Sequence, residues 1–145
     1  NKKNKKSKLA YAFTMDEDAN WQFGYYNNET DMISTFIVDK CISLNESQEI
    51  FKKPGDKVKC INLEEVKINF EKALEKAEQT RKKYYPNETV NKKIAILQNI
   101  KQGQLWNITF VTHSFKTINI KINALNGKLI RHEVVSLFDF KAKAE

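Results

Sequence analysis

The stretch INLEEVKINFEKALEKAEQTRKKYY, residues 61–85, decides the fold because it predicts one long amphipathic helix between two regions of strand-like sequence. Asn62 is placed as an N-cap residue, and Glu65 stands three residues later, as in a capping box. Pro86 disfavours helix at Tyr85 and ends it there. Apolar residues recur at steps of three and four, which predicts one core-facing stripe: Leu63, Val66, Phe70, Ala73, Leu74, Ala77 and Tyr84.

Strand-like segments precede this helix. Residues 9–15, 20–26 and 31–39 have strand character and are separated by short polar stretches, which predicts a three-stranded meander. Residues 40–61 are harder to interpret. Their beginning, CISL, extends the third strand, whereas NESQEIF fits a short helical turn or an irregular loop.

Four more strand segments follow Pro86. The clearest is 117–124, where isoleucine alternates with asparagine and lysine at period two. Residues 92–101 fit a helix about as well as a strand, and we prefer a strand because a Gln-Gly-Gln turn leads into the next one. Asn126-Gly127 predicts a two-residue type I′ turn. The segments are 92–101, 105–112, 117–124 and 128–140, the last with a bulge or bend near Val134-Val135.

This order of segments predicts an α+β fold, in which an antiparallel sheet of about six to seven strands packs on the one long helix. The helix is expected to cover one face of the sheet. Polar residues alternate with the apolar ones on the strand 117–124, so the other face is expected to be partly exposed to water. These polar residues are Asn119, Lys121 and Asn123.

Composition bounds the protein to one soluble domain. Its 145 residues are 41% hydrophobic and 30% charged, which is enough apolar material for a core of its own. We divide the chain into a disordered basic arm (1–8), a single α+β domain (9–140) and a tail (141–145). Five of the seven net positive charges are lysines of the arm. Binding of nucleic acid or another polyanion would therefore rest on the arm.

The second half of the chain also carries a family-like pattern. After the helix, one strand opens with Trp106, the next ends at Asn123-Ala124, and the turn Asn126-Gly127-Lys128 follows. This pattern resembles that of PepSY-type domains. In those domains an acidic residue usually stands at the position of Asn123, and a threonine at the position of Asn126. The resemblance implies a cystatin-like helix on an antiparallel sheet. It also implies a non-catalytic, extracytoplasmic and often membrane-anchored module that binds or restrains peptidases.

Catalytic chemistry has no sequence signature here. The chain has no Gly-rich phosphate loop, no CxxC pair and no HExxH motif. His113 and His132 lack a partner pattern for acid–base catalysis, and Ser114 beside His113 is no nucleophile signal, because neighbours on an extended chain point to opposite sides. We therefore expect no catalytic residues, no cofactor and no metal. A small enzyme whose site the sequence does not reveal is the alternative.

Three aromatic residues, Trp21, Tyr25 and Tyr26, form the candidate surface for a protein or peptide partner. Core packing explains Trp21 and Tyr25 equally well, whereas Tyr26 points to the opposite side by strand parity. Cys41 and Cys60 pair as a disulfide if the domain is extracytoplasmic, and are small core residues in a reducing compartment.

The beginning of the sequence bears on location. It starts at Asn1 rather than at Met, so a signal peptide or membrane anchor upstream would make the basic arm its tether. Four glycosylation sequons agree with export. We expect a non-catalytic extracytoplasmic or membrane-anchored binding module, with a cytoplasmic location as the alternative. The sequons begin at Asn28, Asn45, Asn87 and Asn107.

Overall fold

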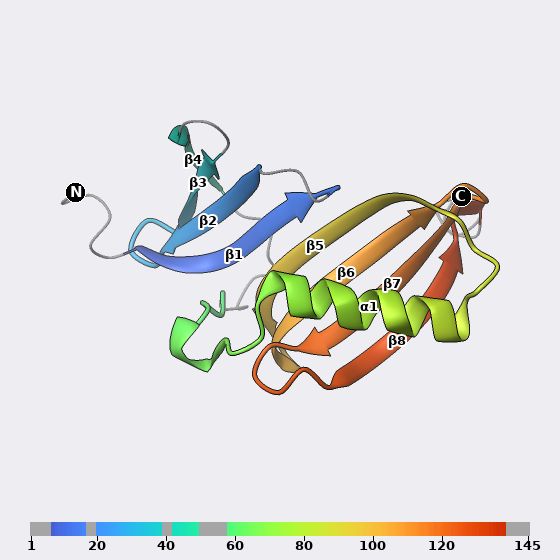
Figure 1. Cartoon of the computed structure of the whole chain (residues 1–145). Coiled ribbons are helices and arrows are strands. Elements are labelled where there is room, and N and C mark those ends of the chain that lie inside the picture. Colours follow the sequence, from blue (N-terminus) through green and yellow to red (C-terminus); the bar gives the residue numbers. More distant parts are fainter. Residues whose placement is uncertain (1–6, 17–19, 39–41, 50–57, 139–145) are drawn as a thin grey trace.

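The computed structural model describes residues 7–16, 20–38, 42–49 and 58–138. These residues form eight strands in one sheet, one α-helix and one short 3₁₀ helix, η2 (Figure 1). The sheet is antiparallel throughout, which confirms the α+β class. The sheet dominates the fold with eight strands rather than six or seven, and the helix, with 15 residues, is shorter than predicted. The elements are β1 (Ser7–Met15), β2 (Trp21–Asn27), β3 (Met32–Val38), β4 (Ile42–Glu49), η2 (Leu63–Glu65), α1 (Phe70–Tyr84), β5 (Val90–Ile100), β6 (Gly103–Thr112), β7 (Lys116–Asn123) and β8 (Leu129–Ser136).

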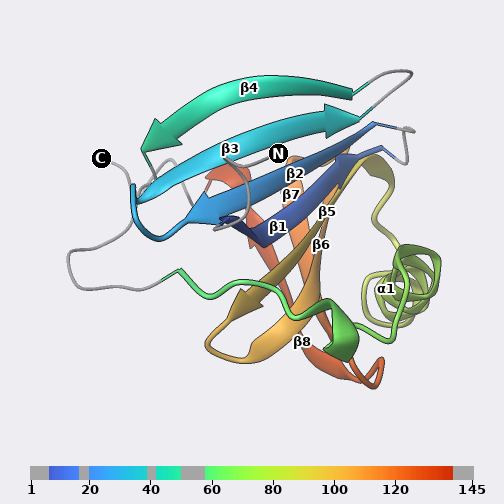
Figure 2. The ribbon, with the colours of Figure 1, turned by 90° about the vertical axis from the view of Figure 1, so that its left-hand side faces the viewer.

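The sheet consists of two four-stranded meanders that meet along β1 and β5. Its strand order is β4-β3-β2-β1-β5-β6-β7-β8. The two central strands pair only from Tyr11 opposite Gln98 to Met15 opposite Ile94. Beyond Tyr11 the beginning of β1 leaves β5, and Figure 2 shows the two meanders turned strongly against each other. This opening between β1 and β5 is called the seam below.

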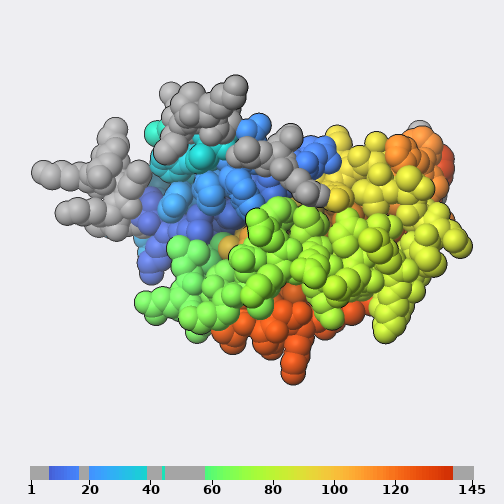
Figure 3. All heavy atoms as spheres, viewed as in Figure 1, coloured from blue at the N-terminus to red at the C-terminus, as the bar shows by residue number. Residues whose placement is uncertain are grey.

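Helix α1 covers one face of the sheet, as expected, and contacts β6 and β7 (Figures 1 and 3). Ala73 and Ala77 are fully buried, and their small side chains let the helix approach the strands closely. Beneath them lie the alternating apolar residues of the central strands, which are also buried. The largest of these are Leu97, Trp106, Ile108, Phe110, Ile118, Ile120 and Ile122.

The helix begins later than the sequence predicted. Its N-cap is Asn69, whose Oδ1 accepts from the backbone N–H of Lys72 at 2.8 Å. Asn62 instead caps η2, accepting from the N–H of Glu64 at 3.1 Å. The reason is tertiary, because the N–H groups of Lys67 and Ile68 both donate to the carbonyl of Ala124 and interrupt the helical hydrogen bonds.

The predicted capping box is also wrong. The N–H of Asn62 donates to Oε1 of Gln104 at 2.6 Å, and Oε2 of Glu65 accepts from Nε2 of Gln104 at 3.1 Å. The side-chain amide of Gln104 in β6 thus binds both Asn62 and Glu65, which were expected to bind each other. The contacts tie η2 to the sheet.

Several strand assignments hold and others need correction. Residues 92–100 of the segment 92–101 lie in strand β5, as preferred. Residues Ile42–Glu49 form a separate strand, β4, so CISL does not extend β3, and residues 45–49 are strand rather than a helical turn or loop. Ser7 and Lys8 belong to β1 rather than to the arm. Residues 1–6 and 139–145, the rest of the expected arm and the tail, lie outside the described residues.

The turn between β7 and β8 is longer than the predicted type I′ turn. Gly127 has a φ of 75°, but Asn126 is not among the described residues with positive φ. The N–H of Gly127 donates to the carbonyl of Asn123, and the N–H of Asn123 donates to the carbonyl of Lys128. The loop therefore spans four residues, 124–127. Oδ1 of Asn123 accepts from Leu125 and Asn126, which holds Asn126 outside the left-handed region.

The irregularity in β8 also lies elsewhere than expected. Opposite β7, the register shifts between Arg131 and Leu129, so Ile130 is the extra residue, not Val134 or Val135.

Candidate functional site

The three candidate aromatic residues do not form one surface. The Trp21 ring lies 5.1 Å from Phe70 and 6.3 Å from Trp106, centroid to centroid, in the core beneath the start of α1. Tyr25 packs edge-on against Phe36 of β3, at 5.4 Å. Tyr26 lies on the opposite side of β2 and is buried. Core packing thus accounts for Trp21, and Tyr26 is separated from it.

The seam between the meanders is filled by residues 58–62, which precede η2. The N–H of Ile61 donates to the carbonyl of Leu9 at 2.7 Å, and Nδ2 of Asn99 donates to the carbonyl of Cys60 at 3.0 Å. The segment is therefore bonded to β1 on one side and to β5 on the other. Figure 3 shows the residues around η2 lying against β1 and β2 at this end of the molecule. The register of β1 against β2 shifts at Ala10, next to the Leu9 carbonyl that accepts from Ile61.

A pocket of about 590 Å³ lies at this seam, and we call it the seam pocket. Its walls come from three parts of the chain: β1, the end of β2 with the turn that follows, and the segment 58–62. Such a volume suits a small ligand or the last few residues of a peptide. The lining residues are Lys8, Tyr26, Asn28, Val58, Cys60, Ile61 and Asn62.

The two candidate residues of the pocket, Tyr26 and Cys60, came from unrelated sequence observations. The hydroxyl of Tyr26 donates to Oδ1 of Asp31. Among the described residues Cys60 has no disulfide partner, and its Sγ lies 4.0 Å from the carbonyl oxygen of Lys8. Cys41 lies outside the described residues, so its pairing with Cys60 stays a prediction.

The electrostatics of the seam pocket are set by one lysine. Burial raises the pKa of the Cys60 thiol, and the positive charge of Lys8 acts in the opposite direction. A raised pKa keeps the thiol protonated near neutral pH, which disfavours nucleophilic chemistry. The pocket therefore has binding groups but no activated nucleophile.

Sequence reasoning missed Lys8, Asn28, Val58 and Asn62 as pocket residues. Lys8 had been assigned to the arm, Asn62 had been read only as a helix cap, and Asn28 was part of a turn. No periodic pattern joins residues that come from three separate segments, so nothing in the sequence signals the pocket.

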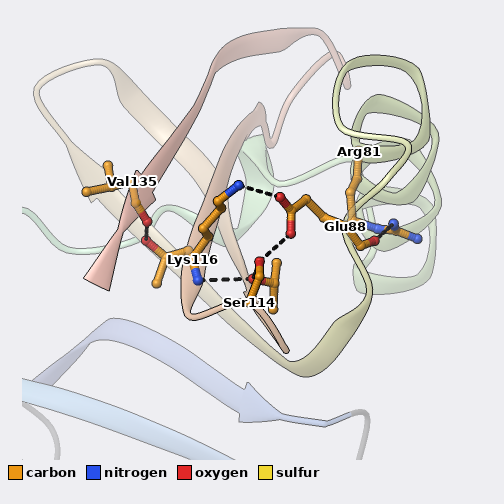
Figure 4. Close-up of polar contacts among 7 residues, drawn as sticks. Arg81, Glu88, Ser114, Lys116 and Val135 are labelled. Carbon is orange, nitrogen blue, oxygen red and sulfur yellow. Dashed lines mark hydrogen bonds and ion pairs between the residues drawn. The ribbon is translucent and has the colours of Figure 1, made fainter. Parts of the chain in front are cut away.

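A second polar cluster lies at the far end of the sheet (Figure 4). Glu88 accepts from Nζ of Lys116 at 2.7 Å and from Oγ of Ser114 at 2.6 Å. Nη1 of Arg81 donates to the Glu88 carbonyl at 3.3 Å. The bonds from Lys116 and Ser114 hold the pKa of Glu88 below its usual value. Because the Glu88 carboxylate accepts from both Ser114 and Lys116, the cluster fastens the turn between β6 and β7 to the start of β5, and the lowered pKa makes Glu88 a weak base.

His132 packs against the two tyrosines at the end of α1. Its Nδ1 lies 2.8 Å from the hydroxyl of Tyr85, and its ring stacks on Tyr84 at 4.1 Å. These contacts fix the end of α1 on β8, and His132 does not line the seam pocket. Within the described ranges, no group of three or more histidine, cysteine or acidic residues is placed to hold a metal ion. Among the described helices, none is long and apolar enough to cross a membrane.

Comparison with known proteins shows a shared fold. No protein-family model matches the sequence, and no curated protein matches it. A crystal structure described as a "putative lipoprotein" from Clostridium difficile 630 superposes with a TM-score of 0.63. The match covers 92% of this chain and 86% of the other, at 12% sequence identity. At that identity the likeness establishes the architecture alone.

Proposed function

We propose that this chain is a non-catalytic binding module that works outside the cytoplasm and binds a protein or peptide. The observation that carries the proposal is the seam pocket, which is assembled from three segments and is lined by Lys8 and two asparagines. A pocket with a few polar groups beside apolar walls is typical of a binding site. The polar clusters around Glu88 and His132 are, by contrast, closed on themselves.

The location outside the cytoplasm has separate support. The fold is shared with a protein described as a lipoprotein, and lipoproteins are held at a membrane by covalent lipid. The PepSY-like pattern points the same way and suggests a peptidase as the partner.

Cell fractionation tests the location. The protein, expressed from its full gene in its own host with a C-terminal tag, should be degraded by protease added to intact cells whose outer wall has been removed. A cytosolic protein of the same cells serves as the control for lysis. Full protection of the tagged protein would contradict an extracytoplasmic role.

A pocket-closing variant tests the binding role. Asn28 lies at the rim in an exposed turn, so Asn28→Trp should cover the pocket without disturbing the core. Thr30→Trp is the matched control, because Thr30 is exposed in the same turn but does not line the pocket. A random peptide library should yield ligands that lose affinity with Asn28→Trp and keep it with Thr30→Trp. Failure of any peptide to bind the unaltered protein would overturn the proposal.

A further inference from the structure

We infer that the seam pocket binds the carboxylate end of a peptide that carries an apolar last residue. The inference rests on the proposed function and names the chemistry of its ligand. It follows from the hydrogen-bonding groups of the walls, from their charge and from the shape of the seam.

The polar wall of the pocket offers donors. Lys8 forms no ion pair with any described residue, but its positive charge is close enough to act on the Cys60 thiol. Oδ1 of Asn62 accepts from the N–H of Glu64, and Asn62 lines the pocket, so Nδ2 is the group that this side chain can offer to a ligand. Asn28 adds a second side-chain amide. One ammonium with two amides matches one carboxylate, which accepts several hydrogen bonds and carries one negative charge.

The acceptors beside the pocket each take a hydrogen bond from within the chain. The carbonyl of Leu9 accepts from Ile61, the carbonyl of Lys8 faces the Cys60 thiol, and the carboxylate of Asp31, which does not line the pocket, accepts from Tyr26. No acidic side chain is among the residues that line the pocket in the described part of the chain. A cationic ligand, such as a peptide amino terminus, would therefore meet Lys8 and find no charge partner.

The rest of the wall is apolar. Val58 and Ile61 line the pocket beside these donors, and Ile61 also belongs to the core cluster, so its position is rigid. A bare inorganic anion would not contact this apolar surface and would leave most of the 590 Å³ pocket empty. The apolar side chain of a peptide's last residue would fill that space and contact the apolar wall. The walls on both sides are fastened to each other through Ile61 and Leu9, which favours a chain that ends in the pocket over one that passes through it.

The experiment compares three sets of fluorescein-labelled hexapeptides by polarisation. The first has a free carboxyl-terminal leucine, the second has the same sequences as amides, and the third has amides with an internal glutamate. We expect the free acids to bind about 10- to 100-fold more tightly than the amides, as a lost charge-assisted hydrogen bond implies. Lys8→Met should remove this difference. Lys59→Met should keep it, because Lys59 is exposed nearby but does not line the pocket.

Cys60 supplies a second readout without mutation. A bound free-acid peptide should slow the alkylation of the Cys60 thiol by N-ethylmaleimide, followed by mass spectrometry of the tryptic peptide that contains it, whereas the amide should not. Equal affinity of acids and amides, or equal affinity for internal glutamate, would overturn the inference while the binding role stands. If no peptide of any set binds, both the inference and the proposed function are overturned.

Discussion

The ring of Tyr11 on β1 lies directly over the α-carbon of Gly24, its partner on β2. A β-carbon at position 24 would fall inside the ring, with its nearest contacts at Cε1, Cδ1 and Cζ of Tyr11. The Tyr11 hydroxyl accepts from Nε2 of Gln22 at 2.8 Å, which holds the ring in place. Glycine at position 24 is thus required by a neighbour across the sheet, and not by its own backbone.

Gly24→Ala should therefore destabilise the protein by about 1–3 kcal/mol, because Tyr11 must leave its place and lose the hydrogen bond. In a Tyr11→Ala background the same change should be neutral or slightly stabilising, since glycine within a strand is unfavourable. Urea denaturation of the four proteins gives the coupling between the two sites. Additive effects of the two substitutions would contradict the contact.

Phe70→Asp should destabilise far more than Lys72→Asp. Phe70 is the first helical residue, and its ring packs on Trp21 and Trp106, so a carboxylate there costs several kcal/mol, about 3 or more. Lys72 is exposed in the first turn, where the helix dipole favours a negative charge by about 0.3–1 kcal/mol. Thermal melts compare the pair. Equal melting temperatures would show that the start of α1 does not dock on the sheet.

Gly127→Val should destabilise by about 1–3 kcal/mol through backbone strain, because Gly127 has a φ of 75°. A β-carbon there would also lie 3.3 Å from Cδ1 of Ile68. Asn126→Gly should cost about 0.5–1.5 kcal/mol rather than nothing, since Oδ1 of Asn126 accepts from the N–H of Lys128. Chemical denaturation measures both. No change in the free energy of unfolding with Asn126→Gly would contradict this hydrogen bond and support the predicted type I′ turn instead.

Phe115→Gly should stabilise the protein by about 0.5–1.5 kcal/mol. Phe115 has a φ of 61°, which strains a bulky residue, and it is 60% exposed, so burial returns little. The hydrogen bond from the Lys116 N–H to Oγ1 of Thr112 holds the turn in this shape. Phe115→Ala keeps the strain but removes the ring, and serves as the control. A stability loss with Phe115→Gly would show that the ring contact with Phe138 outweighs the strain, and a loss larger than with Phe115→Ala would contradict the strain itself.

Acid should weaken the fold through Glu78 and Glu88. Burial raises the pKa of Glu78, but the hydrogen bonds and charges of Arg81 and Lys93 outweigh it, so the net pKa is lowered. The pKa of Glu88 is lowered by Lys116 first and then by Ser114. A carboxylate with a depressed folded pKa stabilises above its unfolded pKa of about 4.3, and this stability is lost as the pH falls through the folded value.

The measurement is urea denaturation at pH 7 and at pH 3. Glu78→Gln should lower the free energy of unfolding at pH 7 and have a smaller effect at pH 3, because at pH 3 the carboxyl of the unfolded chain, with a pKa of about 4.3, is largely protonated. Glu75→Gln, on the exposed side of the same helix, is the control. An effect of Glu78→Gln that is equally large at both pH values would contradict the ion-pair origin of this stability.

Local pattern was sufficient for most of the elements. The period-two alternation of residues 117–124 predicted β7, and the helical stripe from Phe70 to Ala77 predicted the buried face of α1. Each of these signals is carried by neighbours along the chain, because burial of one face imposes its period on the sequence. Gly127 was also predictable, since a left-handed backbone requires a residue without a β-carbon.

Tertiary contacts decided the rest. The helix begins at Phe70 because the carbonyl of Ala124, more than 50 residues away along the chain, captures the N–H groups of Lys67 and Ile68. The bond from Ile61 to Leu9 likewise places residues 58–62 against β1, where they form one wall of the seam pocket. Such contacts join segments whose separation along the chain leaves no periodic trace. Sequence therefore determined most of the strands, the core of the helix and its buried face, whereas only tertiary contacts decided where the helix begins and which residues line the pocket.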